Sequence, residues 1–379
     1  MKKIKKITIV TMQLHTPGGI ERFVTTLANL LVKHFDVTIV ANYGRPSDPL
    51  AFSLDPRIKL HFLTPVQPAE ISLKTLLFRP SKWLQIPTEL HRRHSIDLTQ
   101  NKVFHKFFHN FSTDFIITDR AAYSRLITNH YRGSAIKIAT DHNFHQFNHR
   151  YINELLQSIQ SFNYLVVATN ELRDFYAPLT KTECLTIPNP LPSIPKTKSP
   201  LTSHDLLSVG RLVPEKDFSL LIDTMAIVHQ KMPDAHLTIV GDGKERRTLE
   251  TQITTLGLAD SITLTGWLPQ TEIAKLYLAS SLYVSTSRTE AFGLTITEAM
   301  SYGLPCLALS RASGARAQIT NQTGVLLDTS SPDVIAKNIT DLLLDRPKLL
   351  SLQSNINLDI NKYSATSVEK LWLSLIIKS

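Results

Sequence analysis

The pattern that most restricts the fold of this chain is an alternation of short β-branched runs with longer helix-forming stretches, and it occurs twice. In the first half, the runs predict strands at residues 7–10, 37–41, 58–62, 115–118, 135–139 and 164–168. In the second half, they predict strands at residues 206–210, 236–240, 261–265, 282–285 and 306–310. Such alternation favours a parallel sheet covered by helices, so we expect two open α/β sheets.

A proline-rich passage separates the two occurrences of this pattern. Residues 187–200 read IPNPLPSIPKTKSP, and proline can neither join a central strand nor continue a helix. We therefore predict a first domain at 1–190 and a second at 201–360. An apolar face on the last helix, within 361–379, predicts that it packs back on the first domain. Ligands of open parallel sheets bind outside the carboxyl ends of the strands, so we expect a site in a cleft that both domains face.

The chain carries more basic than acidic residues. Lys and Arg number 41 against 32 Asp and Glu, which gives a formal net charge of +9 and a pI near 9.4. This balance favours phosphate-bearing ligands, an anionic membrane surface or nucleic acid. The two cysteines, Cys184 and Cys306, are too few for a disulfide framework, and no apolar run reaches the roughly 20 residues of a membrane span. We therefore expect a cytoplasmic protein that does not cross the membrane.

Two glutamates bracket seven residues where a predicted loop enters a predicted helix. They are Glu290 and Glu298, in the segment RTEAFGLTITEAMSYGLP at 288–305. One carboxylate can accept hydrogen bonds from two neighbouring hydroxyls, so one glutamate can hold a sugar and the other a ribose. The alternative is that both are ordinary solvated or helical residues. Between them stand residues whose amides can meet a diphosphate at the start of the helix: Phe292, Gly293 and Leu294.

Two basic side chains follow the predicted strand at 206–210. Arg211 and Lys216 stand with Gly210 at its carboxyl end, where ligands bind in open sheets. Fixed cations there can clamp a diphosphate and stabilise the negative charge that a leaving nucleotide gains. A metal ion is then unnecessary, and the chain contains no Asp-x-Asp sequence to hold one. The alternative is a pair of solvated surface charges.

The segment 288–305 resembles the Glu-x7-Glu signature of the retaining glycosyltransferases of family 4. The segments GRLVPEKDF at 210–218 and VGDG at 240–243 match that family in order and spacing. The resemblance is close over 205–330 and looser over the first half. It implies the GT-B fold, with two Rossmann-like domains facing a central cleft, the acceptor bound by the first and the nucleotide sugar by the second. It implies no cofactor, because the nucleotide sugar is a substrate.

The resemblance also implies roles for individual residues. Glu290 would hold the donor sugar, and Glu298 the ribose diol. His142 follows a predicted strand where the family presents a histidine to the transferred sugar, which it would orient rather than act as a base. Trp267 and Leu268 end a strand that lies by the nucleotide base in the family, with a core position for Trp267 as the alternative. The acceptor would enter on the face that the nucleotide leaves, and the departing phosphate would take its proton.

Glycines mark two further turns. Gly18 and Gly19 stand at the start of the first predicted helix, whose free amides and dipole attract phosphate, and the alternative is a plain turn. In the family this loop closes over donor or acceptor. Gly241 and Gly243 follow a strand, but Arg246 stands where a dinucleotide fingerprint has its third glycine. We therefore interpret this second pair as a tight turn beside the nucleotide.

Residues 71–110 combine basic and aromatic side chains. Such a face can lie on an anionic bilayer, which would suit a lipid-linked acceptor, and the alternative is a helical pair with core aromatics and solvated charges. No recognition motif accompanies the charge, so we expect no nucleic-acid partner. His142, His145 and His149 have a spacing that can ligate zinc from one helix, but no further ligand follows at suitable spacing and we expect no metal.

These observations predict a retaining, metal-independent glycosyltransferase that uses a nucleotide diphosphate sugar, with UDP as the expected nucleotide. Its expected acceptor is a glycan, a glycolipid or a cell-surface polymer, because the chain resembles bacterial capsule, exopolysaccharide and teichoic-acid enzymes. Its expected location is the cytoplasm or the inner face of the cell membrane. Ala317 departs from the family, which has an acidic residue in that turn. Two alternatives are a sugar-nucleotide epimerase of the same fold and a nucleotide-sugar-binding subunit without turnover.

Overall fold

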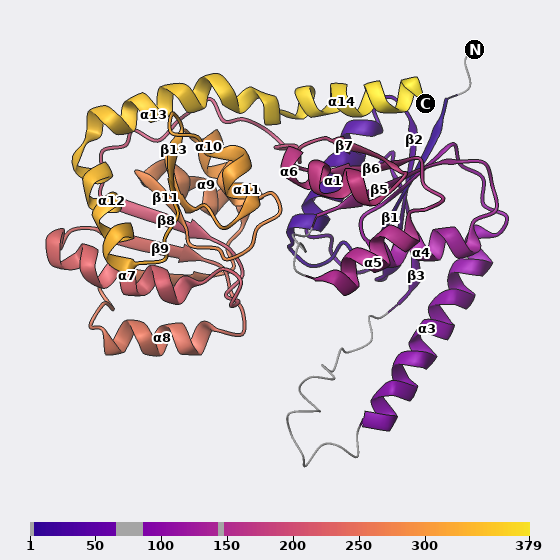
Figure 1. The fold of residues 1–379 in the computed structure, drawn as a ribbon, viewed down its shortest axis with the longest axis horizontal. Helices are drawn as coiled ribbons and strands as arrows, with labels where there is room; N and C mark the ends of the chain where they lie inside the picture. The colour runs from indigo at the N-terminus through magenta and orange to yellow at the C-terminus, as the bar shows by residue number, and fades with distance from the viewer. Residues whose placement is uncertain (1–3, 66–85, 143–147) are drawn as a thin grey trace. The chain divides into compact units, whose positions relative to one another are not determined.

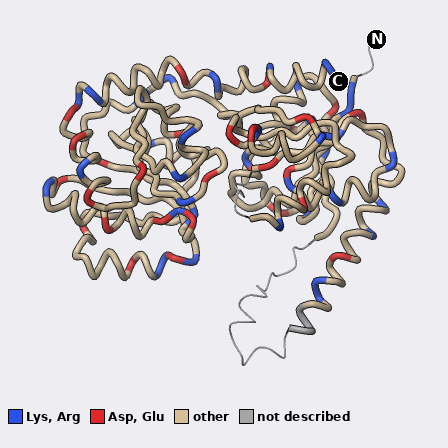
Figure 2. Tube along the Cα trace, in the orientation of Figure 1, with Lys and Arg blue, Asp and Glu red and all other residues tan. Residues whose placement is uncertain are grey.

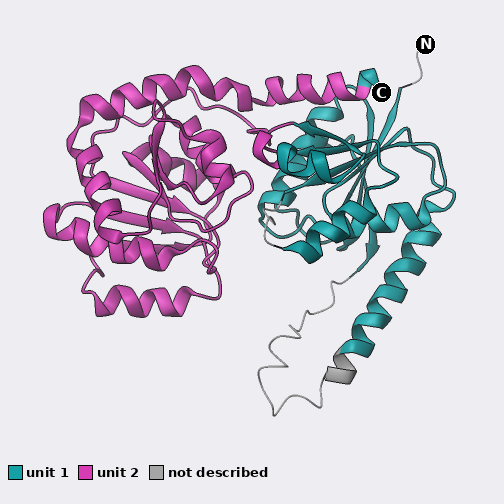
Figure 3. Cartoon of the chain, in the orientation of Figure 1, with its two compact units in different colours: residues 1–167, 173–186, 377–379 teal, residues 168–172, 187–376 magenta. Residues whose placement is uncertain are grey.

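The structure is a computed structural model that describes residues 4–65, 86–142 and 148–379 (Figure 1). It divides into two compact units, which Figure 3 distinguishes by colour. Unit 1 comprises residues 1–167, 173–186 and 377–379, and unit 2 comprises residues 168–172 and 187–376. The domain bounds expected from the sequence, 1–190 with 361–379 and 201–360, stay a prediction.

Unit 1 is built on a seven-stranded sheet with the order β3-β2-β1-β4-β5-β6-β7, in which all neighbours pair in parallel. Its strands are β1 (Lys6–Thr11), β2 (Asp36–Tyr43), β3 (Lys59–Thr64), β4 (Phe115–Thr118), β5 (Ile136–Asp141), β6 (Tyr164–Val167) and β7 (Glu183–Thr186). Its helices are α1 (Gly19–Leu31), α3 (Ile86–Phe108), α4 (Ala121–His130) and α5 (His149–Ser158), followed by α6 (Asn170–Tyr176) and η2 (Ala177–Leu179) at the boundary of the units.

Unit 2 repeats this architecture with a six-stranded parallel sheet of order β10-β9-β8-β11-β12-β13. Its strands are β8 (Asp205–Val209), β9 (His236–Val240), β10 (Ile262–Gly266), β11 (Leu282–Ser285), β12 (Cys306–Leu309) and β13 (Gly324–Leu327). Its helices are α7 (Phe218–Lys231), α8 (Arg246–Thr255), α9 (Gln270–Ala279), α10 (Leu294–Ser301), α11 (Ser313–Gln318), α12 (Pro332–Leu344), α13 (Arg346–Asp359), η3 (Ile360–Tyr363) and α14 (Ala365–Lys378).

The central strands are apolar because helices cover both faces of each sheet. Every residue of β1 after Lys6 is buried, as is all of β4, β11 and β12. The prediction of two open α/β sheets is confirmed, and the predicted strand runs all fall on strands. The sequence analysis missed the edge strands β7 and β13. Most residues of these four-residue strands are only partly buried, so their sequences carry a weaker apolar signal.

The strand order reverses once in each sheet. In unit 1 the reversal lies between β1 and β4, and in unit 2 it lies between β8 and β11. At such a point the loops after the two central strands run in opposite directions and leave a crevice at the carboxyl edge of the sheet. None of the helices that the structure describes has the length and apolar content needed to span a bilayer.

Candidate functional site

The strongest constellation of polar residues lies in unit 2, in the loops that follow β8 and β11 at the reversal of strand order. The loop after β8 carries Lys216, and the loop after β11 carries Glu290. The Lys216 ammonium donates a hydrogen bond to Glu290 Oε2 in a close ion pair. The two side chains are 19% and 21% exposed, so the pair is accessible from solvent. The structure therefore brings together two residues that the sequence analysis placed in one site.

Glycines allow the loops after β8 and β9 to pack closely beside this pair. The amide of Gly210 donates to the carbonyl of Val240 at 2.9 Å, and Gly241 has a φ of +138°. A Cβ on Gly241 would overlap the Gly210 carbonyl, and one on Gly243 would overlap the Leu212 carbonyl. Glycine is required at both positions because no side chain fits between the two strand ends. The interpretation of Gly241 and Gly243 as a tight strand-to-helix turn agrees with this packing.

Helix α10 begins directly after the Glu290 loop. Gly293 precedes it with a φ of +81°, a left-handed conformation that favours glycine. A Cβ on Gly293 would lie 3.1 Å from Glu290 Cγ, so the glycine adjoins the ion pair. The first amides of a helix have no intrahelical partner and attract anions. The start of α10, with Phe292, Gly293 and Leu294, therefore has the geometry expected of a phosphate-binding turn.

A buried glutamine fixes the carbonyl side of this turn. Gln318, fully buried at the end of α11, donates from Nε2 to the carbonyls of Phe292 and Gly293, and its Oε1 accepts from the Thr297 hydroxyl. The carbonyl of Glu290 accepts a second set of bonds from α11, from the Gly314 amide at 2.7 Å and the Ser313 hydroxyl at 3.0 Å. Because the carbonyls face α11, the loop has one defined orientation.

Glu298 differs from Glu290 in burial. It lies on α10 with 5% of its surface exposed, and the Tyr277 hydroxyl donates to its Oε2 at 3.3 Å. Nearby, the Tyr283 hydroxyl donates to Thr295 Oγ1 at 2.8 Å, and burial raises the Tyr283 pKa. These two hydroxyls position both the helix and the Glu298 carboxylate.

Sequence reasoning missed a charged network next to Lys216. Asp217 is buried and adopts a left-handed φ of 53° at the start of α7. Both of its carboxylate oxygens accept bonds from Arg288, at 2.9 and 3.0 Å, and Oδ2 also accepts from Arg311 at 2.7 Å. The Arg311 guanidinium further donates to the Thr286 carbonyl and the Ser330 hydroxyl.

This network ties together the loops that follow β8, β11, β12 and β13. Its residues lie one position after Lys216 and two before Glu290, so it fixes the backbone on both sides of the ion pair. The only sign of this network in the sequence was the acidic residue Asp217 at a predicted helix start. Its partners Arg288 and Arg311 lie 71 and 94 residues away along the chain. Spacing along the chain does not reveal such a contact.

Other predicted residues of unit 2 lie at the surface. Arg211 is exposed, and in the part of unit 2 that the structure describes its guanidinium has no ion-pair partner. Trp267 is 51% exposed, so the alternative of a core position is wrong, while Leu268 packs against the core. Ala317 is exposed on α11, and the neighbouring Arg316 pairs with Glu171 of the same unit. These surface side chains are available to a ligand.

His142 lies in unit 1, just after β5. Its ring packs 4.1 Å from the ring of Phe23 on α1, and its Nε2 lies 2.9 Å from the Thr140 hydroxyl. That hydroxyl donates its own proton to the Thr118 carbonyl, so it accepts from His142 Nε2–H. Burial first, and then Arg120, lower the His142 pKa to about 3. The ring is therefore neutral near pH 7, with Nδ1 as a hydrogen-bond acceptor.

The residue before His142 is held by two tyrosines. The carboxylate of Asp141 accepts hydrogen bonds from the Tyr151 and Tyr176 hydroxyls, at 2.8 and 2.9 Å.

Gly18 caps α1, and Gly19 is its first residue. His145 lies outside the described residues, and among those described no group of three potential metal ligands is present.

The carboxyl ends of β1 and β4 carry a second buried network in unit 1. The Thr11 hydroxyl donates to Asp119 Oδ2 at 2.5 Å, and Arg120 Nε donates to Asp119 Oδ1 at 3.1 Å. Burial raises the pKa of Asp119, which is 1% exposed, while Arg120 opposes the rise. Two central strand ends of unit 1 are thus joined by hydrogen bonds within the protein.

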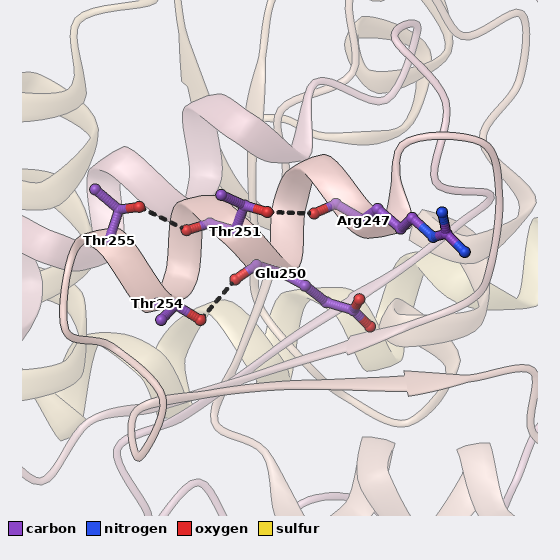
Figure 4. Close-up of a pocket in the computed structure, with 5 residues that line it drawn as sticks. All are labelled: Arg247, Glu250, Thr251, Thr254 and Thr255. Atoms are coloured by element: carbon purple, nitrogen blue, oxygen red, sulfur yellow. Dashed lines mark hydrogen bonds between the residues drawn. The ribbon is translucent and has the colours of Figure 1, made fainter.

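A shallow depression on α8 is not part of either constellation (Figure 4). Its lining comes from one helix: Arg247, Glu250, Thr251, Thr254 and Thr255. The three threonine hydroxyls donate to carbonyls one turn earlier in the same helix, at 2.8 to 3.0 Å. Because these donors are already used within the helix, the depression offers little to a ligand.

Unit 2 is similar in sequence to known glycosyltransferases. Residues 192–358 match the family model described as Glycosyl transferases group 1. A protein of Haemophilus influenzae named an uncharacterized glycosyltransferase is 26% identical over 383 residues, covering 98% of this chain and 100% of the relative. The GtfA subunit of a Streptococcus gordonii UDP-N-acetylglucosamine–peptide N-acetylglucosaminyltransferase is 27% identical over 186 residues, covering 47% of this chain and 36% of the relative.

Solved structures share the whole fold. TarM of S. aureus, in complex with fondaparinux, alpha-GlcNAc-glycerol and UDP, superposes with a TM-score of 0.80 at 16% identity, covering 98% of this chain and 100% of that one. HepE of Anabaena, in complex with UDP and glucose, superposes with a TM-score of 0.74 at 18% identity, covering 99% and 100%. The fold is GT-B, and the chain is a glycosyltransferase.

Proposed function

We propose that this glycosyltransferase moves a sugar, with retention of its anomeric configuration, from a UDP-sugar to a glycan, a glycolipid or a cell-surface polymer. The observation that carries the proposal is the Lys216–Glu290 ion pair at the carboxyl edge of unit 2, beside the start of α10. Support for UDP comes from TarM and HepE, each solved in complex with UDP. Support for a polymeric or glycan acceptor comes from the names of similar proteins alone.

The ion pair suggests how donor binding prepares the reaction. Before the donor arrives, Lys216 and Glu290 neutralise and orient each other. We propose that the diphosphate then takes the Lys216 ammonium, and that the freed Glu290 carboxylate accepts hydrogen bonds from sugar hydroxyls. Lys216 thus exchanges one negative partner for another, whereas Glu290 exchanges its cation for hydrogen-bond donors.

The same arrangement favours the transition state. As the glycosidic bond breaks, negative charge grows on the phosphate oxygen that leaves. Lys216, the exposed Arg211 side chain and the amides at the start of α10 are positive groups in the loops that follow β8 and β11 of unit 2. They stabilise the developing charge more than the charge of the ground state, and this lowers the barrier. A metal ion is not required for this role.

In the proposed reaction no protein side chain attacks the sugar, so the nucleotide and the acceptor set the stereochemical course. The nucleotide leaves and the acceptor hydroxyl attacks on the same face, and the departing phosphate takes the acceptor proton. In unit 1, His142 Nδ1 is buried and has no hydrogen-bond partner among the described residues, and we propose that a sugar hydroxyl donates to it. A histidine that is neutral and already donates from Nε2 is suited to orient a sugar rather than to supply a proton.

Two proposals concern location. We propose that the enzyme acts in the cytoplasm, and that residues within 71–110 contact the anionic inner face of the membrane when the acceptor is lipid-linked. Residues 71–85 lie outside the described part of the chain, so the structural support for this contact comes from α3. The blue positions along α3 in Figure 2 mark its lysines and arginines.

A direct experiment tests the reaction. Purified protein is screened against nucleotide sugars by thermal shift, because a bound ligand raises the melting temperature by mass action. The stabilising donor is then incubated with and without acceptor glycans, and products are analysed by NMR for anomeric configuration. An α-linked product from an α-linked donor supports the proposal, and an inverted product contradicts it. Conversion of the donor sugar without any acceptor would favour the epimerase, and donor binding with no turnover would favour a binding subunit.

A further inference from the structure

Helix α3 carries a row of histidines on one exposed face. With about 100° of rotation per residue, six residues of α3 and its end fall within roughly 80° of one another. We call this face the α3 stripe; it consists of His91, His94, Leu98, Lys102, His105 and His109. All six side chains are exposed, and His109 continues the helical hydrogen bonding by donating its amide to the His105 carbonyl at 3.0 Å.

The opposite side of α3 faces the protein. Phe104 and Phe108 are fully buried there and pack against each other, and Phe104 also packs against Tyr123 of α4. The beginning of the helix extends from unit 1 past its sheet (Figure 1). Packing therefore explains the buried side of α3 but gives no reason for histidines at four of the six stripe positions.

The charge of the stripe depends on pH. Histidine side chains gain positive charge between about pH 8 and pH 5, while lysine is charged throughout. Lys102 has no ion-pair partner among the described residues. Helix α3 contains two acidic residues: Glu89 stands about 160° from His91 around the helix, and Asp97 stands about 60° from His94, at the edge of the stripe. The stripe thus combines one lysine with four histidines and has no carboxylate among its six residues.

Groups on neighbouring elements add to this charge. The ring of His130, at the end of α4, lies 5.7 Å from the ring of His105, and its Nε2 is 2.8 Å from Asn101 Oδ1. Burial, His105 and Arg132 lower the pKa of His130. On α3 itself Lys106 flanks the stripe, whereas His61 of β3 packs against Phe107 on the inner side. His130, Arg132 and Lys106 are thus neutral or cationic, whereas the Asp97 carboxylate lies at the edge of the stripe.

We propose that the α3 stripe is a proton-dependent contact surface for an anionic lipid bilayer. This deepens the membrane contact proposed above and rests on it. A straight row of cations on a projecting helix matches a flat array of lipid phosphates. Exposed leucines favour a bilayer over a soluble polyanion, since Leu98, 48% exposed, lies within the row and Leu90, 51% exposed, lies beside it. An acyl interface can bury these side chains, and a hydrated polymer cannot.

The test is co-sedimentation of the full chain with vesicles, in EDTA and at low ionic strength. Phosphatidylcholine vesicles with and without phosphatidylglycerol are compared at about pH 7.5 and about pH 5.5, on either side of the ordinary histidine pKa. We expect binding to the anionic vesicles to tighten at least about tenfold at the lower pH, and binding to neutral vesicles to stay weak. An equal affinity at both pH values, or the same pH response with neutral vesicles, overturns the proposal.

Variants assign the effect to the stripe. The combined substitutions His91→Gln, His94→Gln, His105→Gln and His109→Gln keep polar side chains on an exposed face and should abolish the pH response. His34→Gln with His149→Gln, which removes two exposed histidines elsewhere in unit 1, should retain it. A retained response in the fourfold variant contradicts the proposal. Circular dichroism at both pH values establishes that each variant is folded.

Two further measurements separate the outcomes. Leu98→Gln should weaken vesicle binding but not binding to soluble polyphosphate; unchanged vesicle binding together with a pH-dependent polyphosphate complex would assign the stripe to a polyanion and overturn the bilayer. Thermal shift by UDP should be the same in the fourfold variant and the wild type. If UDP produced no thermal shift in the wild type, that would contradict the proposed donor site but not the proposed role of the stripe. If the protein bound no vesicles at either pH, that would contradict both the role of the stripe and the membrane contact.

Discussion

The two sheets share their central strand order, but the polar residues at the carboxyl ends of their central strands are used differently. In unit 1, Asp119 is 1% exposed and satisfied by Thr11 and Arg120. In unit 2, Lys216 and Glu290 form a partly exposed pair that rests on a buried network around Asp217. The same position in the fold carries a buried hydrogen-bond network in unit 1 and an accessible charged pair in unit 2.

This difference indicates how the shared architecture can divide two tasks. A buried carboxylate with all its partners in the protein is costly to separate from them and is suited to a structural role. A cation and a carboxylate near solvent can exchange partners with a charged ligand at small cost. We therefore expect changes in unit 2 to act on transfer and changes in unit 1 to act first on stability.

The largest expected effect comes from removing either member of the exposed pair. Glu290→Ala or Lys216→Ala should lower kcat/KM by about 10²–10³-fold, because each removes a group aligned with developing charge or with the donor sugar. The melting temperature should change little, since the pair is partly exposed. Steady-state kinetics and thermal unfolding measure the two quantities. Lys244→Ala, which removes an exposed lysine of the same unit, serves as the control, and near-normal turnover in both site variants would contradict the assignment.

A smaller effect on transfer, with a larger effect on stability, is expected for Asp217→Asn. Asparagine tolerates the left-handed φ of 53° but removes the charge that Arg288 and Arg311 share, so the free energy of unfolding should fall by about 1–3 kcal/mol. Since the loops that carry Lys216 and Glu290 lose their common anchor, kcat should fall by about tenfold. Urea unfolding and kinetics test this.

Asp217→Glu is the informative companion to that variant. It keeps the charge but lengthens the side chain, so a purely electrostatic role predicts recovery of both stability and rate. Recovery of stability without recovery of kcat would show that the geometry of the network positions the pair. If Asp217→Asn left both quantities unchanged, the network would have no role in holding the site.

In unit 1, the low pKa of His142 predicts a stability effect that depends on pH. The folded-state pKa is about 3, below the ordinary value of 6.5, so the unfolded chain binds the proton more readily. The contribution of His142 is fully present above about pH 6.5 and is lost as the pH falls toward 3. At about pH 5 the loss should be about 2 kcal/mol, or about 4–8 °C in the melting temperature.

His142→Gln should remove that part of the acid sensitivity. Differential scanning calorimetry between about pH 7 and pH 5 measures it, and His204→Gln, in an exposed ion pair of unit 2, is a control with a different environment. His142→Gln should lower the transfer rate less than Glu290→Ala does, because His142 is proposed only to orient the sugar. An unaltered pH profile of stability would contradict a neutral buried imidazole.

The smallest expected effect is that of chelation. If Lys216, Arg211 and the start of α10 neutralise the diphosphate, EDTA should leave the initial rate within about twofold of the untreated enzyme. Rates with and without added Mg²⁺ or Mn²⁺ provide the comparison. Strong inhibition by EDTA that divalent cations reverse would refute a metal-independent reaction.

Several features of the site could be predicted from the sequence because their signals are local. Strand runs such as 206–210 and 282–285 are apolar on both faces, and Gly293 and Glu290 stand together where a loop enters a helix. The helix start and the strand end are both encoded within a few residues. The sequence therefore indicated the fold class and the segment that carries the charged pair.

The Asp217 network and the burial of Gln318 were not predicted, because neither has a local pattern. Arg288 and Arg311 lie 71 and 94 residues from Asp217, and they meet it only because β8, β11 and β12 end side by side in one sheet. Likewise, Trp267 looks the same in sequence whether it fills a core or lies 51% exposed.

The sequence by itself determined the succession of strands, helices and tight turns, since backbone preferences and apolar periodicity act over a few neighbouring residues. The tertiary structure alone decided that Lys216 reaches Glu290, that Asp217 joins two arginines, and that the α3 stripe is exposed beside His130. The physical reason is that hydrogen bonds and ion pairs depend on distance in space, and strand order sets which distant segments become neighbours.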